Sequence, residues 1–232
     1  LIQLDIGKMK SLRRPAVYQG VTYPDYEIDF YTSQVYSLRS GIVLKPYFSG
    51  RGYLEFNFQI EGAIKKARQH KILAETFYDL LSKSPLVSHY DLQIGKDRHE
   101  LKTATGFRVI CNMVCPDHID GDITNNHYSN LMIVTQSENN IKRSPSNGKK
   151  YKSGSKDLRR DNSYRVQIRF PNVLDKNGKH FLKCKTFKTE EEAALAYNTM
   201  LEEALLTIFG PDLGSKMYDL AYKNVIKSPV QQ

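Results

Sequence analysis

The sequence contains few cysteines. Cys111, Cys115 and Cys184 are too few and of the wrong parity for a disulfide framework, and this usage is typical of a reducing cytosol. Three residues separate Cys111 from Cys115, and His118 follows closely, but no second pair completes a zinc site. We therefore expect ordinary apolar thiols, with a structural zinc site as the alternative.

Long apolar runs are also absent. No stretch approaches the roughly 18–20 consecutive apolar residues that cross a bilayer, and the first 14 residues have no apolar segment behind their basic residues. We therefore expect no membrane contact and no secretory signal, and we predict a cytoplasmic protein. Hydrophobic residues make up 40% and charged residues 25% of the chain, proportions typical of a globular protein that buries a core.

Acidic residues are scarce in one segment. Between residues 142 and 188 the sequence has fifteen lysines and arginines but only three aspartates, a net charge of +12. The whole chain carries +9, so the other residues carry −3 and the basic surplus belongs to this segment. Such a concentration of positive charge predicts a polyanionic partner and is the electrostatic footprint of nucleic-acid binding.

The apolar periodicity and the turn residues predict an α+β fold built from several modules. Alternating runs predict strands, a 3.6-residue period predicts helices, and a stretch rich in serine, glycine and lysine predicts a linker. The predicted strands are 27–31, 34–38, 42–44, 53–58, 109–114 and 131–134, the predicted helices are 66–82 and one beginning within 135–143, and the predicted linker is 144–155.

The C-terminal part predicts a hairpin followed by a helix. Asn177-Gly178, between β-prone runs at 164–170 and 180–187, is a strong hairpin signal. Residues 189–192, Thr-Glu-Glu-Glu, match a capping box, so we expect a helix to begin there.

Alternation along the two predicted strands assigns a face to each side chain. On the first strand, the polar residues Arg165, Gln167 and Arg169 fall on one face and apolar residues on the other. On the second strand, we expect Leu182 and Cys184 in the core, while Lys183 and Lys185 point outward. A sheet with one apolar face on a helix and one basic face can enter the major groove of DNA.

Residues 117–140 contain the side chains that phosphodiester cleavage needs. Cleavage requires a base to activate water and a divalent cation to neutralise charge on the phosphate and the leaving oxygen. Asp117 and Asn139 offer hard oxygen ligands suited to Mg²⁺, and His118 is suited to act as the base. A hairpin turning at 120–122 and 125–126 would bring the two ligands together. An isolated Asp-His pair would instead be an ordinary turn.

The segment contains Asp117-His-Ile-Asp-Gly, Asn125-Asn126, Asn130-Leu and Val134-Thr-Gln-Ser-Glu-Asn-Asn. With these motifs it resembles phage and intron-encoded HNH homing endonucleases, in which a β-hairpin and a helix surround one cation. The resemblance implies a central ββα-metal HNH core over 109–143. It also assigns roles: Asp117 and Asn139 bind Mg²⁺ or Mn²⁺, His118 activates water, and Asn130 holds the loop and orients His118.

The remaining polar residues of this region receive structural interpretations. We expect Asn125 and Asn126 to serve turn conformations and His127 to be solvated, with a role at the scissile phosphate as the alternative for His127. His70 is expected to pack or to contact a DNA backbone instead of reacting. Many relatives have histidine at the position of Asp117, although the Asp-His form is itself a known variant of the family.

Two further segments extend the resemblance. Residues 26–46 look like the small β module that precedes HNH domains in these phage enzymes, and residues 70–77 look like the helix between them. Residues 164–170 and 186–197 resemble the APETALA2-like DNA-binding domain, which has a three-stranded sheet and a helix and is found fused to HNH endonucleases. The tryptophan usual on its third strand is absent and Lys183 stands there, which favours contacts to the DNA backbone over an inherited base preference.

These resemblances predict the following domain organisation. The domains are an N-terminal β DNA-binding module at 20–66, an HNH nuclease domain at 67–143, the linker at 144–155, an APETALA2-like domain at 156–212 and a C-terminal tail at 213–232; residues 86–108 match nothing in the family. The predicted DNA-binding residues are Lys149, Lys150, Arg159, Arg160, Arg165, Gln167, Arg169, Lys183 and Lys185.

The predicted function is site-specific cleavage of double-stranded DNA by a homing-type endonuclease. One active site per chain suggests a monomer on DNA that nicks one strand, acting in the host cytoplasm if a phage encodes it. One alternative is a DNA-binding regulator whose HNH fold no longer cuts, and another is an RNA-directed or general defence nuclease. The set Asp117, His118, Asn130 and Asn139 favours the enzyme, since a dead site has no reason to keep all four.

Overall fold

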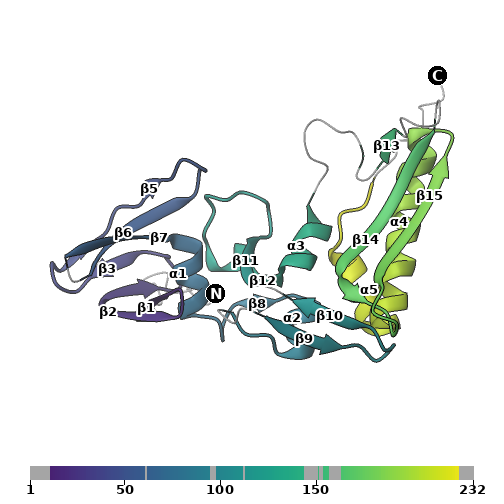
Figure 1. Ribbon diagram of the computed structural model, residues 1–232. Coiled ribbons are helices and arrows are strands. Elements are labelled where there is room, and N and C mark those ends of the chain that lie inside the picture. The colour runs from purple at the N-terminus through teal and green to yellow at the C-terminus, as the bar shows by residue number, and fades with distance from the viewer. Residues whose placement is uncertain are drawn as a thin grey trace, which may run out of the picture. The chain divides into compact units, whose positions relative to one another are not determined.

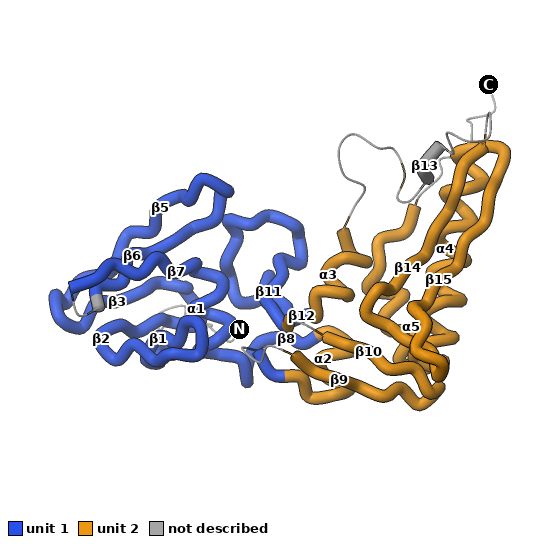
Figure 2. Tube along the Cα trace, in the orientation of Figure 1, with its two compact units in different colours: residues 1–83, 93–96, 114–134 blue, residues 84–92, 97–113, 135–232 orange. Residues whose placement is uncertain are grey.

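The structure is a computed structural model that describes residues 11–60, 62–94, 98–111, 113–143, 151, 154–156 and 163–224. The chain forms two compact units, shown in different colours in Figure 2. Unit 1 comprises residues 1–83, 93–96 and 114–134, and unit 2 comprises residues 84–92, 97–113 and 135–232. Each unit mixes helices and strands, as the α+β prediction requires. Among the described residues, no helix has the length and apolar character to cross a membrane.

Unit 1 is made mostly of β-strands arranged in three small sheets (Figure 1). Its elements are β1 (Arg13–Tyr18), β2 (Val21–Asp29), β3 (Val35–Ser37), β4 (Ile42–Val43), β5 (Tyr47–Phe48), β6 (Leu54–Ile60), β7 (Ala63–Arg68), α1 (Gln69–Thr76), β8 (Ser82–Lys83), β11 (Val114–His118), the 3₁₀ turn Tyr128–Asn130 and most of β12 (Leu131–Thr135). The sheet orders are β1-β2-β3-β4, β5-β6-β7 and β11-β12-β8.

Aromatic residues form much of the core of unit 1. Phe56 and Phe58 alternate with exposed polar residues along β6 and are fully buried, as period-two side-chain alternation requires. Tyr26 of β2 stacks on Phe58 with ring centroids 4.4 Å apart, so the first two sheets share one core. Leu73 and Phe77 add the buried side of α1 to this core.

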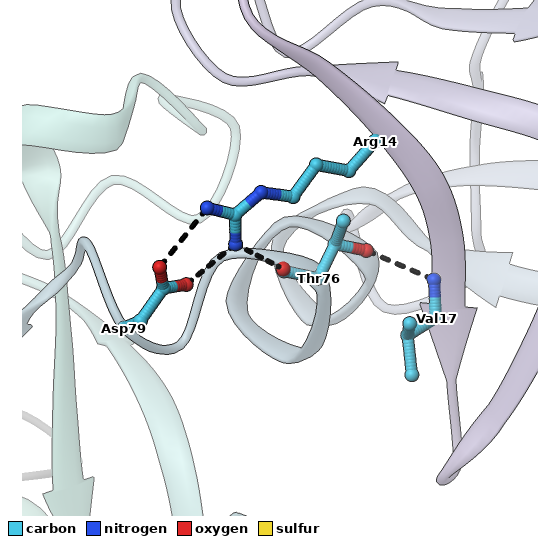
Figure 3. A network of polar contacts seen from close by, with 4 residues as sticks. All are labelled: Arg14, Val17, Thr76 and Asp79. Carbon is cyan, nitrogen blue, oxygen red and sulfur yellow. Dashed lines mark hydrogen bonds and ion pairs between the residues drawn. The ribbon is translucent and has the colours of Figure 1, made fainter.

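β1 precedes every predicted strand and is tied to the end of α1. The two terminal nitrogens of Arg14 donate to the two carboxylate oxygens of Asp79 at 2.6 and 3.0 Å, and Nη1 also reaches the carbonyl oxygen of Thr76 (Figure 3). The Thr76 hydroxyl accepts from the backbone N–H of Val17 at 2.9 Å. The Arg14 and Asp79 side chains are 37% and 58% exposed, so this ion pair sets the position of the strand more than it stabilises the fold.

The predicted helix over 66–82 is wrong at both ends. Residues 63–68 form β7 and pair antiparallel with β6, where Ala67 lies opposite Phe56. α1 therefore begins only at Gln69 and ends at Thr76. Long-range backbone pairing, which local periodicity does not encode, has overridden the helical pattern. The four predicted N-terminal strands correspond to β2, β3, β4 and β6, with shifted ends.

Unit 2 is built on a five-stranded sheet in which β13, β14, β10 and β9 follow one another and β15 pairs with β14 (Figure 1). Its elements are α2 (Pro85–Tyr90), β9 (His99–Lys102), β10 (Arg108–Cys111), α3 (Gln136–Lys142), β13 (Gly154–Lys156), β14 (Tyr164–Leu174), β15 (His180–Phe187), α4 (Glu190–Phe209) and α5 (Pro211–Leu220). The predicted C-terminal sheet of three strands is thus extended by β9 and β10. This happens because β14 continues past Phe170 to pair with β10.

The long helix α4 packs against β14 and β15 and carries the main apolar face of unit 2. Its predicted capping box is confirmed, since Thr189 accepts from the Glu192 backbone N–H and Glu192 accepts from the Thr189 backbone N–H. Ala193, Tyr197 and Leu201 are among its buried residues, which matches the predicted apolar face.

The predicted C-terminal tail at 213–232 is wrong in its first part, because residues 211–220 form α5. Leu213 and Met217 are buried. At Gly214 an added Cβ would lie 2.7 Å from the carbonyl oxygen of Leu205 on α4, so only glycine permits this close crossing. Beyond α5, Asn224 donates to the carbonyl oxygen of Ala194 at 3.0 Å and holds the following segment on α4.

Candidate active site

Two strands, a connecting loop and a helix follow one another over residues 114–142. β11 and β12 are neighbours in one sheet of unit 1, and α3 follows β12 directly. The predicted strand at 109–114 is wrong as a single element, because β10 ends at Cys111 and β11 runs from Val114 to His118. β11 thus carries Asp117 and His118 at its end, where the loop begins.

Asn130 holds the loop between the two strands. Its amide nitrogen donates to the Asp120 carboxylate at 2.9 Å and to the carbonyl oxygen of Asn125 at 2.8 Å, and its amide oxygen accepts from the Asp120 backbone N–H at 3.0 Å. Side-chain hydrogen bonds from Asn125 and Asn130 lower the pKa of Asp120, which keeps this loop residue an acceptor. The predicted loop-holding role of Asn130 agrees with these bonds, which join both sides of the loop.

The side chain that contacts His118 is that of Asn126. Asn130 accepts through its backbone carbonyl from the N–H of Ile119, which follows His118, and its role in orienting His118 stays a prediction. His118 Nε2 lies 2.8 Å from Asn126 Oδ1, and both side chains are buried. From its place in the Asn125-Asn126 pair, Asn126 is predicted only to serve a turn conformation. Asn-Asn pairs are common in turns, so the sequence alone does not distinguish a turn asparagine from one that binds a buried histidine.

His70 lies beside His118 and is confirmed as a packing residue. Its ring meets the His118 ring edge-on with centroids 5.1 Å apart and contacts Tyr53 on another side. Burial, followed by the adjacent His118, lowers the pKa of His70 to about 3, so the ring is neutral at physiological pH. Nδ1 of His70 is buried without a hydrogen-bond partner.

The two predicted metal ligands lie in different units. Asp117 is a half-buried residue of β11 in unit 1, and Asn139 is a buried residue of α3 in unit 2. Asn139 Oδ1 accepts a hydrogen bond from Arg143 Nε at 3.3 Å. Their joint binding of one cation stays a prediction. Among the described residues, no group of three or more histidine, cysteine or acidic side chains is arranged to hold a metal ion.

α3 begins at a second capping box, which is completely buried. Thr135 Oγ1 accepts from the Glu138 backbone N–H, and the Glu138 carboxylate accepts from the Thr135 backbone N–H and hydroxyl. The same carboxylate also accepts from the Ser84 hydroxyl at 2.5 Å and from the Leu86 backbone N–H at 2.8 Å. Glu138 thus joins the start of α3, which carries Asn139, to the start of α2.

The three cysteines differ in their surroundings, and Cys111 fits the prediction of an apolar thiol. Cys111 is buried, and burial raises the pKa of its thiol to about 12, with a smaller contribution from Glu138. Cys115 is half-buried and Cys184 is exposed, where its Sγ accepts from Arg165 Nε at 2.9 Å, and none of the three forms a disulfide.

The basic strand β14 has the predicted two faces. Val166, Ile168 and Phe170 are buried towards α4, whereas the three predicted DNA-contacting residues of this strand are exposed: Arg165, Gln167 and Arg169. Lys149, Lys150, Arg159 and Arg160 lie outside the described residues.

The predicted faces of β15 are wrong. Ile168 pairs with Lys183 and Val166 with Lys185, so both lysines lie on the helix side of the sheet. Lys183 Nζ forms an ion pair with Glu203 of α4 at 2.7 Å. Leu182 and Cys184 lie on the outward face instead, opposite the strand positions of Arg169 and Gln167. Both faces of β15 contain apolar residues, so alternation alone does not show which face packs on the helix. The register with β14 determines it, and the prediction chose the opposite face.

Comparison with known proteins adds to this geometry. The sequence model described as "HNH endonuclease" matches residues 112–141. The chain is 32% identical over 136 residues to the uncharacterized HNH endonuclease L560 of Acanthamoeba polyphaga mimivirus, a match that covers 53% of this chain and 67% of that protein.

A solved structure of the HNH homing endonuclease I-HmuI, described as showing DNA binding and cleavage, is similar at 24% identity with a TM-score of 0.32. That match covers 49% of this chain and 48% of the I-HmuI chain, so this chain spans about half the length of that enzyme. The family model ends at residue 141, before the predicted APETALA2-like domain, which stays a prediction. The family match over residues 112–141, together with the viral relative, shows that this chain belongs to the HNH endonuclease family.

Proposed function

We propose that the chain is a metal-dependent endonuclease that hydrolyses phosphodiester bonds of double-stranded DNA. The observation that carries this proposal is the environment of His118. Its ring stands at the end of β11, beside Asp117, and a 2.8 Å hydrogen bond to Asn126 fixes it. A histidine held in one orientation next to a hard oxygen ligand is the arrangement that a base for water activation requires.

The donor set fits a hard divalent cation. Asp117 supplies a carboxylate, and Asn139 supplies an amide oxygen that retains acceptor capacity beside its long bond from Arg143. These two residues would hold Mg²⁺ or Mn²⁺, and the bound cation would neutralise charge that develops on the phosphate. His118 would accept the proton of the attacking water, while Asn130 keeps the loop in place through its bonds to Asp120 and Asn125.

The outward face of β14 would hold the DNA. Arg165 and Arg169 are exposed on one face with Gln167 between them, and the segment from 142 to 188 carries a net charge of +12. A sheet backed by a helix and exposing arginines suits contacts to phosphates and groove edges. We propose that the enzyme is of the homing type and that these residues belong to an APETALA2-like C-terminal module. It would bind DNA as a monomer through this module and nick one strand.

The proposal is tested with supercoiled plasmid. Incubation with the full chain and Mg²⁺ or Mn²⁺ should produce open-circular DNA, whereas the same incubation with EDTA should leave the plasmid supercoiled because the hydrolytic centre needs its cation. Mapping the ends by run-off sequencing then distinguishes one cut strand from two. Because a site-specific enzyme spares plasmids without its target, the same assay is run on a plasmid library of DNA sites. Binding to this library without cutting any member in either metal would identify a non-cleaving DNA-binding regulator and refute the enzyme.

The corrected strand faces give a prediction about affinity. Arg165→Gln and Arg169→Gln should each weaken DNA binding and reduce the slope of log affinity against log salt by about 1, because each removes one phosphate contact. Lys183→Gln should change the slope much less, since Lys183 already pairs with Glu203 on the helix side. Fluorescence anisotropy over a salt series measures all three slopes. Equal effects of the lysine and arginine variants would contradict the assignment of faces.

A further inference from the structure

Asn126 belongs to a closed ring of hydrogen bonds with two residues that no motif singled out. Asn126 Nδ2 donates to Gln69 Oε1 at 2.9 Å, and Gln69 Nε2 donates to the carbonyl oxygen of Ser33 at 2.7 Å. Ser33 Oγ donates to the carbonyl oxygen of Asn126 at 2.7 Å and closes the ring. All three residues are buried, so water does not compete for these bonds.

The ring fixes which way each side-chain amide points. A backbone carbonyl oxygen can only accept, so Gln69 must turn its NH₂ group to Ser33 and its oxygen to Asn126. Asn126 must then turn its own NH₂ group to Gln69 and its oxygen to His118. Because that oxygen can only accept, His118 Nε2 must donate and therefore carries the proton. Nδ1 is left as the nitrogen of the neutral ring that can accept a proton.

The turn that presents Ser33 is held by hydrogen bonds of its own. Ser33 has a φ of 56°, in the left-handed region that a serine rarely adopts. The buried Asp29 carboxylate holds the turn, since Oδ1 accepts from the backbone N–H groups of Tyr31 and Thr32. Its other oxygen accepts from the Ser11 hydroxyl at 2.6 Å. The carbonyl oxygen of Ser33 is therefore a fixed reference point for the ring.

We propose that Gln69 and Ser33 are positioning residues that set the tautomer of His118 through Asn126. The N-terminal β module would thus take part in the chemistry as well as in any contact with DNA. The consequence is that Nδ1 of His118 serves as the base, and this part of the inference rests on the proposed function. The tautomer itself is a property of the protein alone and can be measured without substrate.

The test is ¹⁵N NMR of the histidine rings in the full chain without metal, recorded at the alkaline end of a titration where the rings are neutral. The His118 signals are assigned by their loss in His118→Gln. Wild-type His118 should show a protonated Nε2 and an unprotonated Nδ1. Gln69→Met removes both amide contacts and frees Asn126 to rotate, so the spectrum should change to a mixture of tautomers. The single-turnover cleavage rate should fall by about 10- to 100-fold.

A second substitution separates this effect from a general disturbance. Asn126→Asp places a carboxylate, which can only accept, against His118, so the Nε2–H tautomer should persist whether or not Gln69 is present. Gln69→Met should then change the His118 tautomer in the protein with Asn126. In the Asn126→Asp background, Gln69→Met should leave the tautomer unchanged. A double-mutant cycle measures this coupling. Amide spectra of each variant establish that it is folded.

Two results would overturn the inference. One is a wild-type His118 protonated on Nδ1, a measurement that requires no variant to fold. The other is a folded Gln69→Met variant whose tautomer equals the wild type, or shifts equally with and without Asn126→Asp. Failure of the wild type to cleave DNA would refute the proposed function instead, since the NMR result stands without cleavage.

Discussion

His118→Ala is expected to abolish DNA cleavage and to leave DNA binding almost unchanged. A positioned general base contributes about 10²- to 10⁴-fold to a rate, and no other described side chain occupies the place of His118 against Asn126. Binding should persist because the exposed arginines of β14 belong to unit 2, whereas His118 belongs to unit 1. Single-turnover cleavage and fluorescence anisotropy on one duplex measure the two quantities.

His89→Ala provides the matched control. His89 is exposed near the end of α2 and contacts the neighbouring Tyr90 ring, so the same substitution there should keep activity within about twofold, as expected for a surface change. Full activity of folded His118→Ala protein would overturn the mechanism. Equal loss in both variants would point to a general effect of removing a histidine.

Glu138→Ala is expected to destabilise unit 2 by about 3–5 kcal/mol. The substitution leaves four donors without their acceptor: the backbone N–H groups of Thr135 and Leu86, and the hydroxyls of Thr135 and Ser84. Glu138 is fully buried, and each abandoned buried donor costs its full desolvation penalty. The unfolding temperature of unit 2 should fall by at least roughly 10 °C, since about 2–4 °C per kcal/mol are lost in domains of 150–250 residues and more in smaller ones.

Glu192→Ala tests the same capping geometry in an exposed setting. Glu192 occupies the equivalent position of the capping box of α4, where its carboxylate accepts from two backbone N–H groups. Because Glu192 is exposed, water can replace it, and the loss should be about 1 kcal/mol or less. Thermal unfolding followed by circular dichroism compares the two variants. Similar losses would show that burial of Glu138 adds nothing to its capping role.

The order of elements around the candidate site could be predicted because local signals encode it. β12, the start of α3 after Thr135 and the turns around Asp120 and Gly121 all have short-range signatures. The partner of His118 could not be predicted. Asn126 and Gln69 are 57 positions apart in the sequence, and their contact depends on tertiary packing that no local pattern describes.

Errors elsewhere have the same physical origin. β15 has apolar residues in both phases of its alternation, so only its register with β14 places Lys183 against the helix. The helical period predicted a helix from residue 66, but residues 63–68 form a strand because they pair with the backbone of β6. α5 was assigned to a tail because Leu213 and Met217 are buried by packing on α4, which Gly214 permits and which a local sequence pattern does not reveal.

The ring of Ser33, Gln69 and Asn126 also bears on when the protein becomes active during its synthesis. The ring cannot close until residue 126 has left the ribosome, and its bonds join residues that are 36, 57 and 93 positions apart. Contacts of such large sequence separation form late, after the entropy of closing long loops has been overcome. A nascent or partly folded chain would therefore carry His118 without its fixed orientation, so the proposed strand cleavage would begin only after the ring has closed.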